Sequence, residues 1–486
     1  MSGALSVLRV YALILMIFSL TMLLPLAASW IFADGAHNAY DEGILISLLA
    51  GLVMWWVTRR HREELKVRDG FLLVVLTWVG LPAFATIPLM SYFWPKLSFT
   101  DAYFESMSGL TTTGATVLDG LDQLPFSINL WRAELVWLGG MGLIVLAVAI
   151  LPLLGVGGRQ MFKAEAPGPM KDAKLTPRMA ETAKGLWLVY FYITVACFVV
   201  LLAAGMSWRD AIVHTFTIMG LGGFSSHDAS FGFFNSVPIE IATIFFMTLA
   251  GMNFATHFLA LRNQSFSPYR WDPEVRWFVF VVYASILGLA LYLWGMGSYP
   301  EFATALRYAA FNTVSIATTT GFANTDYNLW PIFAPLWMLF LSSFVTCSGS
   351  TGGGIKMVRA IVLYKQVFRE VQRAIHPRAV NSIKLGNEVV ENRIVFAILA
   401  FGFMYMVSIV SLTLVLSATG LDIVTAFSAV VACINNTGPG LNQVGPATTY
   451  AVLSDLQTWV CSFAMLLGRL EIFTLLVVLT PAFWRK

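Results

Sequence analysis

Four short segments of the chain have the residue types needed to bind a cation through backbone and hydroxyl oxygens. Each carries glycine and no charge, and small residues of this kind let a backbone approach an ion closely. They are Leu110-Thr-Thr-Thr-Gly-Ala-Thr116, Gly220-Leu-Gly-Gly-Phe-Ser225, Thr318-Thr-Thr-Gly-Phe-Ala323 and Asn435-Asn-Thr-Gly-Pro-Gly440. Irregular backbone at membrane depth is tolerated only where it is buried in protein or lines a water-filled or ion-filled path. Four such segments predict a ring of loops that conducts a cation.

The candidate cation-binding residues are the three that end at the shared glycine of each segment. They are Thr112, Thr113 and Gly114; Leu221, Gly222 and Gly223; Thr319, Thr320 and Gly321; and Asn436, Thr437 and Gly438. Glycine suits the last position because it takes a positive φ at little cost and leaves room beside the path. The alternative is that glycine and threonine merely let membrane helices pack closely. Four copies with matched flanks argue against it.

Composition defines the class of protein. Of 486 residues, 58% are hydrophobic and 12% are charged, which excludes a soluble fold. A spanning helix needs about 20 apolar residues. The sequence therefore predicts an all-α polytopic membrane protein with about ten spans, near 8–33, 43–58, 70–92, 130–156, 185–206, 237–262, 276–296, 330–348, 393–418 and 450–480.

The apolar runs and the glycine segments form a repeat of helix, short helix, loop and helix. The predicted units are an N-terminal helix pair in 1–69, pore repeats in 70–157, 185–265 and 276–356, and a fourth pore repeat in 393–484. The short helices are expected at 101–110, 210–219, 303–317 and 422–434, with Asp101, Asp210 and Asp422 as N-caps and no clear cap in the third. Their carboxyl ends would direct a partial negative charge at the membrane centre, which favours a cation.

Basic residues gather in alternate connections of the chain. The clusters lie in 59–68, 159–184, 262–276 and 356–384, and the positive-inside rule places them in the cytoplasm together with both termini. Acidic residues fill the opposite connections, on the side of the four loops. Four cysteines lie in apolar stretches without metal-ligand spacing, so neither a disulfide nor a metal cofactor is expected.

The second long helix of the third repeat is interrupted by glycine and serine. The segment Thr346-Cys-Ser-Gly-Ser-Thr-Gly-Gly-Gly-Ile-Lys356 cannot remain a stable helix, because each interior glycine costs about 1 kcal/mol relative to alanine. A loop here would project into the ion path below the four glycine segments and block ions. The candidate gate residues are Ser348, Gly349, Ser350, Thr351, Gly352, Gly353 and Gly354. A phosphate-binding turn is the alternative, but the P-loop spacing is missing.

Arg469 is a charge within the last long apolar stretch. A charge at membrane depth is costly and usually faces a cavity or a partner. Either Arg469 projects into the path below the loops, or it pairs with nearby Glu471 or extends to the inner surface.

These motifs resemble the Trk, Ktr and HKT superfamily of potassium transporters over nearly the whole chain. The resemblance implies four membrane-pore-membrane units in a pseudo-fourfold arrangement around a central pore, with potassium as the transported ion and no other cofactor. Glycine at Gly114, where sodium-permeable relatives carry serine, favours potassium. It also implies that the glycine-rich segment is an intramembrane gate acting with Arg469. The expected location is the bacterial inner membrane.

The resemblance further implies two protein partners and no nucleic acid. One is a second copy of the chain, in a homodimer with one pore per protomer. The other is a cytosolic TrkA-like regulatory ring that binds NAD and adenine nucleotides. Segment 357–384 alternates basic and apolar residues, which is typical of an amphipathic helix on a partner or on lipid headgroups.

Two function classes fit the residues. One is a gated, channel-like conductor of potassium. The other is a carrier that couples potassium to proton or sodium movement, since carriers also use broken helices. Four copies in one orientation, without a chain of membrane-embedded acids, favour the conductor over the carrier, and a membrane enzyme is not expected.

Overall fold

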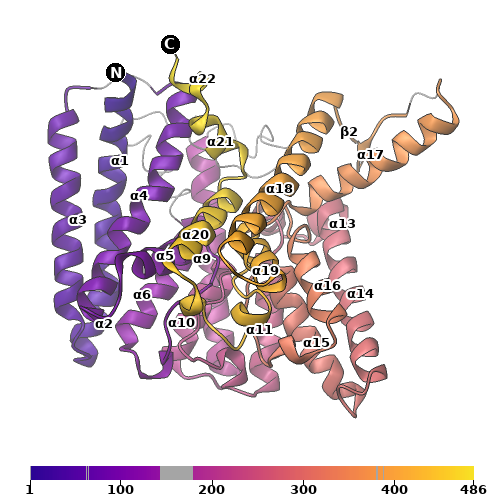
Figure 1. Ribbon diagram of the computed structural model, residues 1–486, viewed down its shortest axis with the longest axis horizontal. Coiled ribbons are helices and arrows are strands. Elements are labelled where there is room, and N and C mark those ends of the chain that lie inside the picture. The colour runs from indigo at the N-terminus through magenta and orange to yellow at the C-terminus, as the bar shows by residue number, and fades with distance from the viewer. Residues whose placement is uncertain are drawn as a thin grey trace.

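The protein is represented by a computed structural model that describes residues 2–61, 63, 65–142, 179–378, 381–386 and 388–485. Within these ranges the chain is almost entirely helical (Figure 1). The exception is an antiparallel hairpin of β1 (Lys384–Leu385) and β2 (Glu388–Val389), in which Lys384 lies opposite Val389. The all-α membrane fold expected from the sequence is confirmed.

Six helices of the described residues are long and apolar enough to cross a membrane. They are α1 and its continuation α2 (Ser2–Thr21 and Leu23–Phe32), α3 (His37–Thr58), α4 (Val67–Phe93), α9 (Met179–Ala203), α14 (Pro273–Gly295) and α18 (Asn392–Ala418). Large apolar side chains stay exposed on their outer faces, among them Val53, Phe280 and Phe403. Exposure of this kind is suited to lipid contact, because a helix that is apolar all round is either buried or lipid-facing.

Within the described residues, several of the predicted spans are not continuous helices, because second helices of the repeats are broken. In the second repeat, α11 (Val237–Ala250) and α12 (Phe254–Arg262) meet at 93°, and in the fourth, α20 (Asp455–Arg469) and α21 (Phe473–Leu479) meet at 113°. In the third, α16 (Phe333–Ser342) ends after 10 residues. Counting each bent pair as one span gives up to eight in the part of the chain that the structure describes.

The first repeat is irregular at the corresponding place. Helix α6 (Phe126–Trp137) passes into a π-helical turn, Leu138–Gly142. The rest of the predicted span 130–156, and the basic connection that follows it from Arg159 to Arg178, lie outside the described residues. We expected a break in the third repeat alone, whereas the structure also interrupts the second helix in the second and fourth repeats.

The four short helices form as predicted. They are α5 (Phe99–Leu110), α10 (Trp208–Gly220), α15 (Phe302–Ala317) and α19 (Ile423–Ile434). Each loop that follows carries a 3₁₀ turn, in Leu121–Gln123, Ser230–Gly232, Tyr327–Leu329 and Asn442–Val444. The remaining short elements are α13 (Ser267–Trp271), α22 (Pro481–Trp484) and a turn at Tyr450–Val452.

The caps of the short helices differ in part from the prediction. Asp422 is the N-cap of α19 and accepts the Thr425 N–H, as expected. Asp101 and Asp210 are not caps: Ser98 and Ser207 cap α5 and α10, and each aspartate accepts a hydrogen bond from its serine hydroxyl. The serines precede the aspartates by three residues, so the carboxylates occupy the first turn, where the helix dipole favours them. Helix α15 has no side-chain cap, as predicted.

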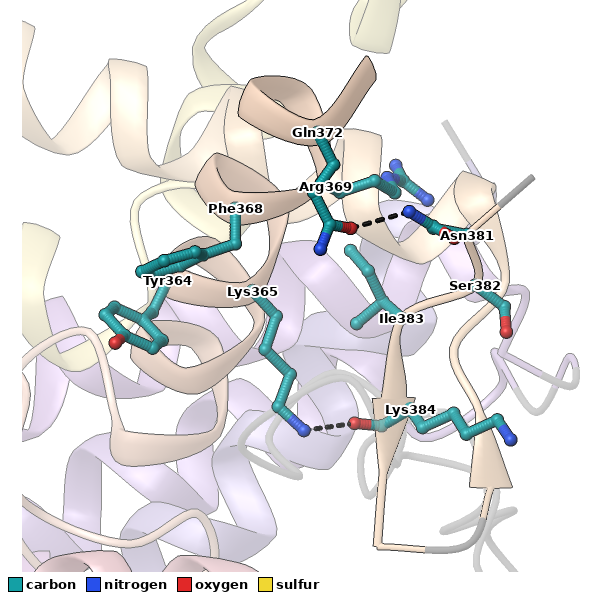
Figure 2. Close-up of a pocket in the computed structure, with 9 residues that line it drawn as sticks. All are labelled: Tyr364, Lys365, Phe368, Arg369, Gln372, Asn381, Ser382, Ile383 and Lys384. Carbon is teal, nitrogen blue, oxygen red and sulfur yellow. Dashed lines mark hydrogen bonds between the residues drawn. The ribbon is translucent and has the colours of Figure 1, made fainter. Parts of the chain in front are cut away.

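The predicted amphipathic segment 357–384 is helical only in its first part. Helix α17 (Met357–Ile375) projects from the body of the protein, and it ends before Pro377, which disfavours a helical residue before it (Figure 1). The chain then returns as the β1–β2 hairpin. Figure 2 shows the hairpin region held against α17 by hydrogen bonds from Lys365 Nζ to the Lys384 carbonyl and from Asn381 to Gln372, each 2.6 Å long.

Candidate ion pathway

The four short helices end in the same backbone reversal. The second residue beyond each helix has a left-handed conformation in repeats one, three and four, and the first does in repeat two: φ is 56° at Thr112, 54° at Leu221, 60° at Thr319 and 54° at Asn436. The next N–H bonds back to the carbonyl five residues earlier, at 2.8 Å from Thr113 to Ser108 and 2.7 Å from Thr320 to Ser315. This is a Schellman-type ending, which turns the chain out of the helix axis. Sequence reasoning missed it because no glycine marks the left-handed residue.

The shared glycines bring the four loops together into a closed ring. A Cβ atom added to Gly114 would lie 2.3 Å from Gly223 N, and one on Gly223 would lie 2.6 Å from Thr320 O. One on Gly321 would lie 2.1 Å from Thr437 O, and one on Gly438 would lie 2.6 Å from Thr113 O. Each glycine thus abuts the next loop, in the order one, two, three, four and back to one. The ring leaves no room for a side chain.

A positive φ was expected at all four glycines and is found at three. The angle is 79° at Gly114, 91° at Gly321 and 96° at Gly438, but Gly223 is not among the positive-φ residues. At Gly223 the need for glycine is steric alone, because the neighbouring backbone occupies the space of a Cβ. Gly222 is equally confined, with its Cβ position 3.0 Å from the Thr112 backbone.

The ring contains buried carbonyl oxygens that the protein leaves without partners. Within the described part of the chain, the carbonyls of Thr112, Leu221, Thr319 and Asn436 accept no hydrogen bond, although all four residues are fully buried. In repeats one and three the hydroxyls beside them are occupied: Thr111 bonds Thr113 at 2.8 Å, and Thr318 bonds Thr320 at 2.8 Å. A buried carbonyl without a partner is costly unless water or an ion satisfies it. One such oxygen from each repeat is what a cation site requires.

The glycine-rich segment of the third repeat packs against the ends of three short helices. Gly353 donates its N–H to Thr319 Oγ1 at 2.8 Å, and Thr351 donates its hydroxyl to the Met219 carbonyl at 3.0 Å. A Cβ on Gly353 would lie 1.9 Å from the Asn435 carbonyl oxygen. The segment therefore touches repeats two, three and four at the carboxyl ends of their short helices, where sequence reasoning placed a blocking loop.

Two further contacts hold the base of this loop closed. Ile355 N–H donates to the Ser343 carbonyl at 2.6 Å, and Met357 N–H donates to the Thr346 carbonyl at 2.8 Å. Ser348 N–H donates to Glu274 at 2.7 Å, which ties the loop to α14. Residues 348–354 thus form one compact excursion between α16 and α17.

Arg469 connects the same site to the first repeat. Its guanidinium donates to Thr112 Oγ1 at 3.1 Å, to the Thr351 carbonyl at 3.0 Å and to the carbonyls of Gly139 and Gly140. It therefore links the fourth repeat to the first repeat and to the glycine-rich loop. Its alternative partner from sequence, Glu471, binds Arg359 of α17 at 2.5 Å.

On the loop side of the ring, a histidine joins the first and second repeats. His227 Nδ1 faces Asp122 in a very short contact, and Nε2 lies 3.1 Å from Asp210 Oδ1. The imidazole ring of His227 stacks on the Phe233 ring with 3.5 Å between the two centroids. Asp228 lies beside the pair and donates its N–H to Asp122 at 3.2 Å. Because both ring nitrogens meet carboxylates, the imidazole must carry two protons to donate to both.

This contact predicts a pH-dependent stability. Burial lowers the pKa of His227, but its hydrogen bonds to Asp210 and Asp122 outweigh burial and raise the pKa above the ordinary value. The stabilisation is complete below the ordinary pKa of histidine and is lost as pH rises through the raised one. Melting temperatures of the wild type and His227→Gln should therefore differ by a few degrees near neutral pH and converge in alkali. His37→Gln, which removes a histidine whose ring is tilted by 37° against Trp30, is the control for the loss of a histidine ring. A constant gap for His227→Gln would contradict the assignment.

Comparison with known proteins identifies the family. A family model described as TrkH, cation transport protein, matches residues 36–486. The chain belongs to the TrkH family. Its members are transport proteins rather than enzymes. Among the described residues no cluster of histidine, cysteine and carboxylates could hold a metal ion as a cofactor.

Characterised TrkH proteins match the chain from end to end. The Trk system potassium uptake protein TrkH of Vibrio parahaemolyticus is 47% identical over 483 residues, which covers 99% of both chains. That of Escherichia coli K12 is 45% identical over 478 residues, covering 98% of this chain and 99% of the other. The crystal structure of the potassium transporter TrkH from Vibrio parahaemolyticus matches with a TM-score of 0.89 at 45% identity, covering 99% of each chain.

Proposed function

We propose that this chain takes up potassium across the bacterial inner membrane through the ring of four loops. The observation that carries the proposal is the closed ring, with a buried, unpaired carbonyl from each repeat. The residues that would bind the ion are Thr112, Thr113, Gly114, Leu221, Gly222, Gly223, Thr319, Thr320, Gly321, Asn436, Thr437 and Gly438. The four short helices end at this ring, so their dipoles favour a cation over an anion.

Potassium is the proposed ion for two reasons. The similar proteins of Vibrio parahaemolyticus and Escherichia coli carry potassium uptake in their names. In addition, glycine occupies the shared position of all four loops, so no side chain narrows the ring. Carbonyl oxygens held in number around a dehydrated ion are the means by which potassium filters discriminate.

The glycine-rich loop and Arg469 are proposed to form the gate. Residues 348–354 fill the space where the ends of the short helices converge, and Arg469 places a positive charge among them. A cation leaving the ring would meet both a steric and an electrostatic barrier. The contacts of residues 348–354 with the ends of the short helices correspond, on this proposal, to a closed gate.

Helix α17 is proposed to transmit regulation to this gate. It begins directly after the glycine-rich loop and projects from the body, and Arg359 ties it to Glu471 at the break of the fourth repeat (Figure 1). Force applied to α17 by a cytosolic TrkA-like ring that binds NAD and adenine nucleotides would pull on the loop. The exposed apolar stripe of α17, Tyr364, Val367, Phe368, Val371 and Ile375, would serve a second copy in a homodimer.

The proposed orientation puts both termini in the cytoplasm. They lie at the same end of the molecule, as this orientation requires (Figure 1). Residues Arg59 and Arg262, at the ends of α3 and α12, carry the positive charge expected on that side.

A carrier that couples potassium to protons or sodium is the second candidate. The second helices of the second and fourth repeats are bent by 93° and 113°. These breaks favour a carrier, because coupled carriers also build ion sites at broken helices. The two functions differ in whether flux needs a second ion gradient.

Deleting residues 348–354 tests the proposed function. The base of the loop is already closed by the Ser343–Ile355 and Thr346–Met357 hydrogen bonds, so the flanking chain can be rejoined. Purified wild type and deletion variant are placed in liposomes, and potassium flux and reversal potential are measured. We expect the deletion to raise flux by about tenfold or more, because a barrier of only about 1.4 kcal/mol accounts for that factor. The reversal potential should follow the potassium gradient.

Thr351→Val provides a milder variant that loses only the hydroxyl bound to Met219, and it should raise flux less. Unchanged flux in both variants would refute the gate. Flux that requires a proton or sodium gradient would favour the carrier.

A further inference from the structure

A fully buried ion pair lies behind the first and second loops of the ring. Glu105 on α5 and Arg132 on α6 are 2.8 Å apart, and their side chains are 0% and 1% exposed. Burying two charges is costly unless geometry and further hydrogen bonds compensate. The hydrogen bonds of this pair therefore indicate which parts of the chain it holds in place.

Glu105 binds the exit of the first loop. It accepts the Thr116 hydroxyl at 2.9 Å and the Val117 N–H at 3.0 Å, both just beyond Gly114. Arg132 Nη2 also donates to Thr116 Oγ1, at 3.2 Å. Both charges thus converge on one short stretch of backbone.

Arg132 reaches the second loop as well. Its Nη1 donates to the Ser225 carbonyl at 3.1 Å, two residues beyond Gly223, and to Asn129 at 3.1 Å. Its guanidinium lies 4.3 Å from the ring centroid of Phe224. One ion pair therefore grips two neighbouring loops at equivalent points, on either side of the Gly114–Gly223 contact.

The four repeats differ at this position. The residue nine places before the shared glycine is Glu105, His214, Asn312 or Ala429. His214 Nε2 lies 2.9 Å from Ser225 Oγ, and Asn312 donates to Asn324 at 2.6 Å, so each also holds the exit of its own loop. A carboxylate occupies this position in the first repeat only, and its arginine partner extends the contact to a second loop.

We propose that Glu105 and Arg132 are positioning residues that set the distance between the first and second loops, and with it the potassium selectivity of the ring. The inference rests on the proposed function. The pair touches no ion itself, and it acts by fixing the backbone that carries two of the four carbonyl groups. Selectivity is a difference between two binding free energies, so a small change in ring size changes it.

The test is the permeability ratio of potassium to sodium, measured from reversal potentials in liposomes. Glu105→Gln leaves a buried unpaired charge and risks misfolding, so the double variant Glu105→Gln with Arg132→Gln removes both charges. Thr116→Val is a third variant, which removes only the hydroxyl that the pair binds. We expect the ratio to fall by about fivefold in the variants that fold.

A matched control is the Arg307–Glu240 pair, which is 2.7 Å long and lies outside these loops with Arg307 26% exposed. Its double glutamine variant should keep the wild-type ratio. A wild-type ratio in folded Thr116→Val and in the double Glu105/Arg132 variant would overturn the inference. Wild type without a potassium-driven reversal potential would instead overturn the proposed function, so the two failures are distinguishable.

Discussion

Alanine at Gly321 is expected to abolish potassium flux in liposomes, with a loss of about a hundredfold or more. Gly321 has a φ of 91°, and the added Cβ would lie 2.1 Å from the Thr437 carbonyl oxygen. Real contacts are never this short, so the third and fourth loops must separate. The ring would then lose the spacing of its carbonyls, and because the clash is with backbone, no side chain can move aside to relieve it.

Gly420 provides the matched control for this substitution. Its φ is 97°, so alanine there suffers similar backbone strain, yet its Cβ would meet nothing within 4 Å. Gly420→Ala should keep wild-type flux and selectivity with a small loss of stability. Wild-type flux in both Gly321→Ala and Gly420→Ala would show that the ring is not the path. Equal loss in both would assign the defect to strain alone.

Glutamine at Arg469 is expected to raise potassium flux by about tenfold, through two effects. The first is the loss of a positive charge beside the ring, where it opposes a cation. The second is the loss of bonds to Thr112, Thr351, Gly139 and Gly140, which fasten the loop to the first repeat. Flux is measured without any regulatory partner, so that only the intrinsic barrier changes.

Lysine at Arg469 separates these two effects. An ammonium keeps the charge but has no planar fork with which to reach the four acceptors together, so Arg469→Lys should raise flux less than glutamine. Arg209→Gln is a control that removes an arginine lying 4.6 Å from the ring centroid of Phe32, far along the sequence from the gate, and it should leave flux unchanged. An Arg469→Gln variant with wild-type or lower flux would contradict the proposed barrier.

The short helices and the glycine loops could be predicted because local signals specify them. A half-length apolar segment and a glycine after its end recur in each repeat, and a polar capping residue stands at the start of three of them. The glycine-rich break before Lys356 was predictable for the same reason, since glycine is a poor helix former.

The break in the fourth repeat could not be predicted in this way. Leu470, Glu471 and Ile472 are ordinary helix residues, yet φ is 52° at Glu471 and 55° at Ile472. Tertiary contacts impose the conformation: a Cβ on Gly468 would lie 1.9 Å from the Ile434 carbonyl oxygen, so α20 is pressed against the end of α19. Propensity carries no information about such contacts.

The partners of buried charges were equally hidden. Glu105 and Arg132 are 27 residues apart, with the whole first loop between them, so their pairing depends on how that loop folds back. The link from Arg469 to Thr112 joins positions 357 residues apart. Sequence alone indicated that Arg469 needs a cavity or a partner, and only the folded chain identifies the groups that it binds.

The ring can close only late in biosynthesis. Its last contact joins the fourth loop to the first: Asn436 donates to Thr113 at 3.1 Å, and Gly438 abuts the same residue. Ribosomes synthesise the chain from its amino terminus, so the first three loops are made before the fourth repeat is available to close the ring. A product that is terminated before the fourth repeat lacks the residues that make this last contact, so its ring stays open.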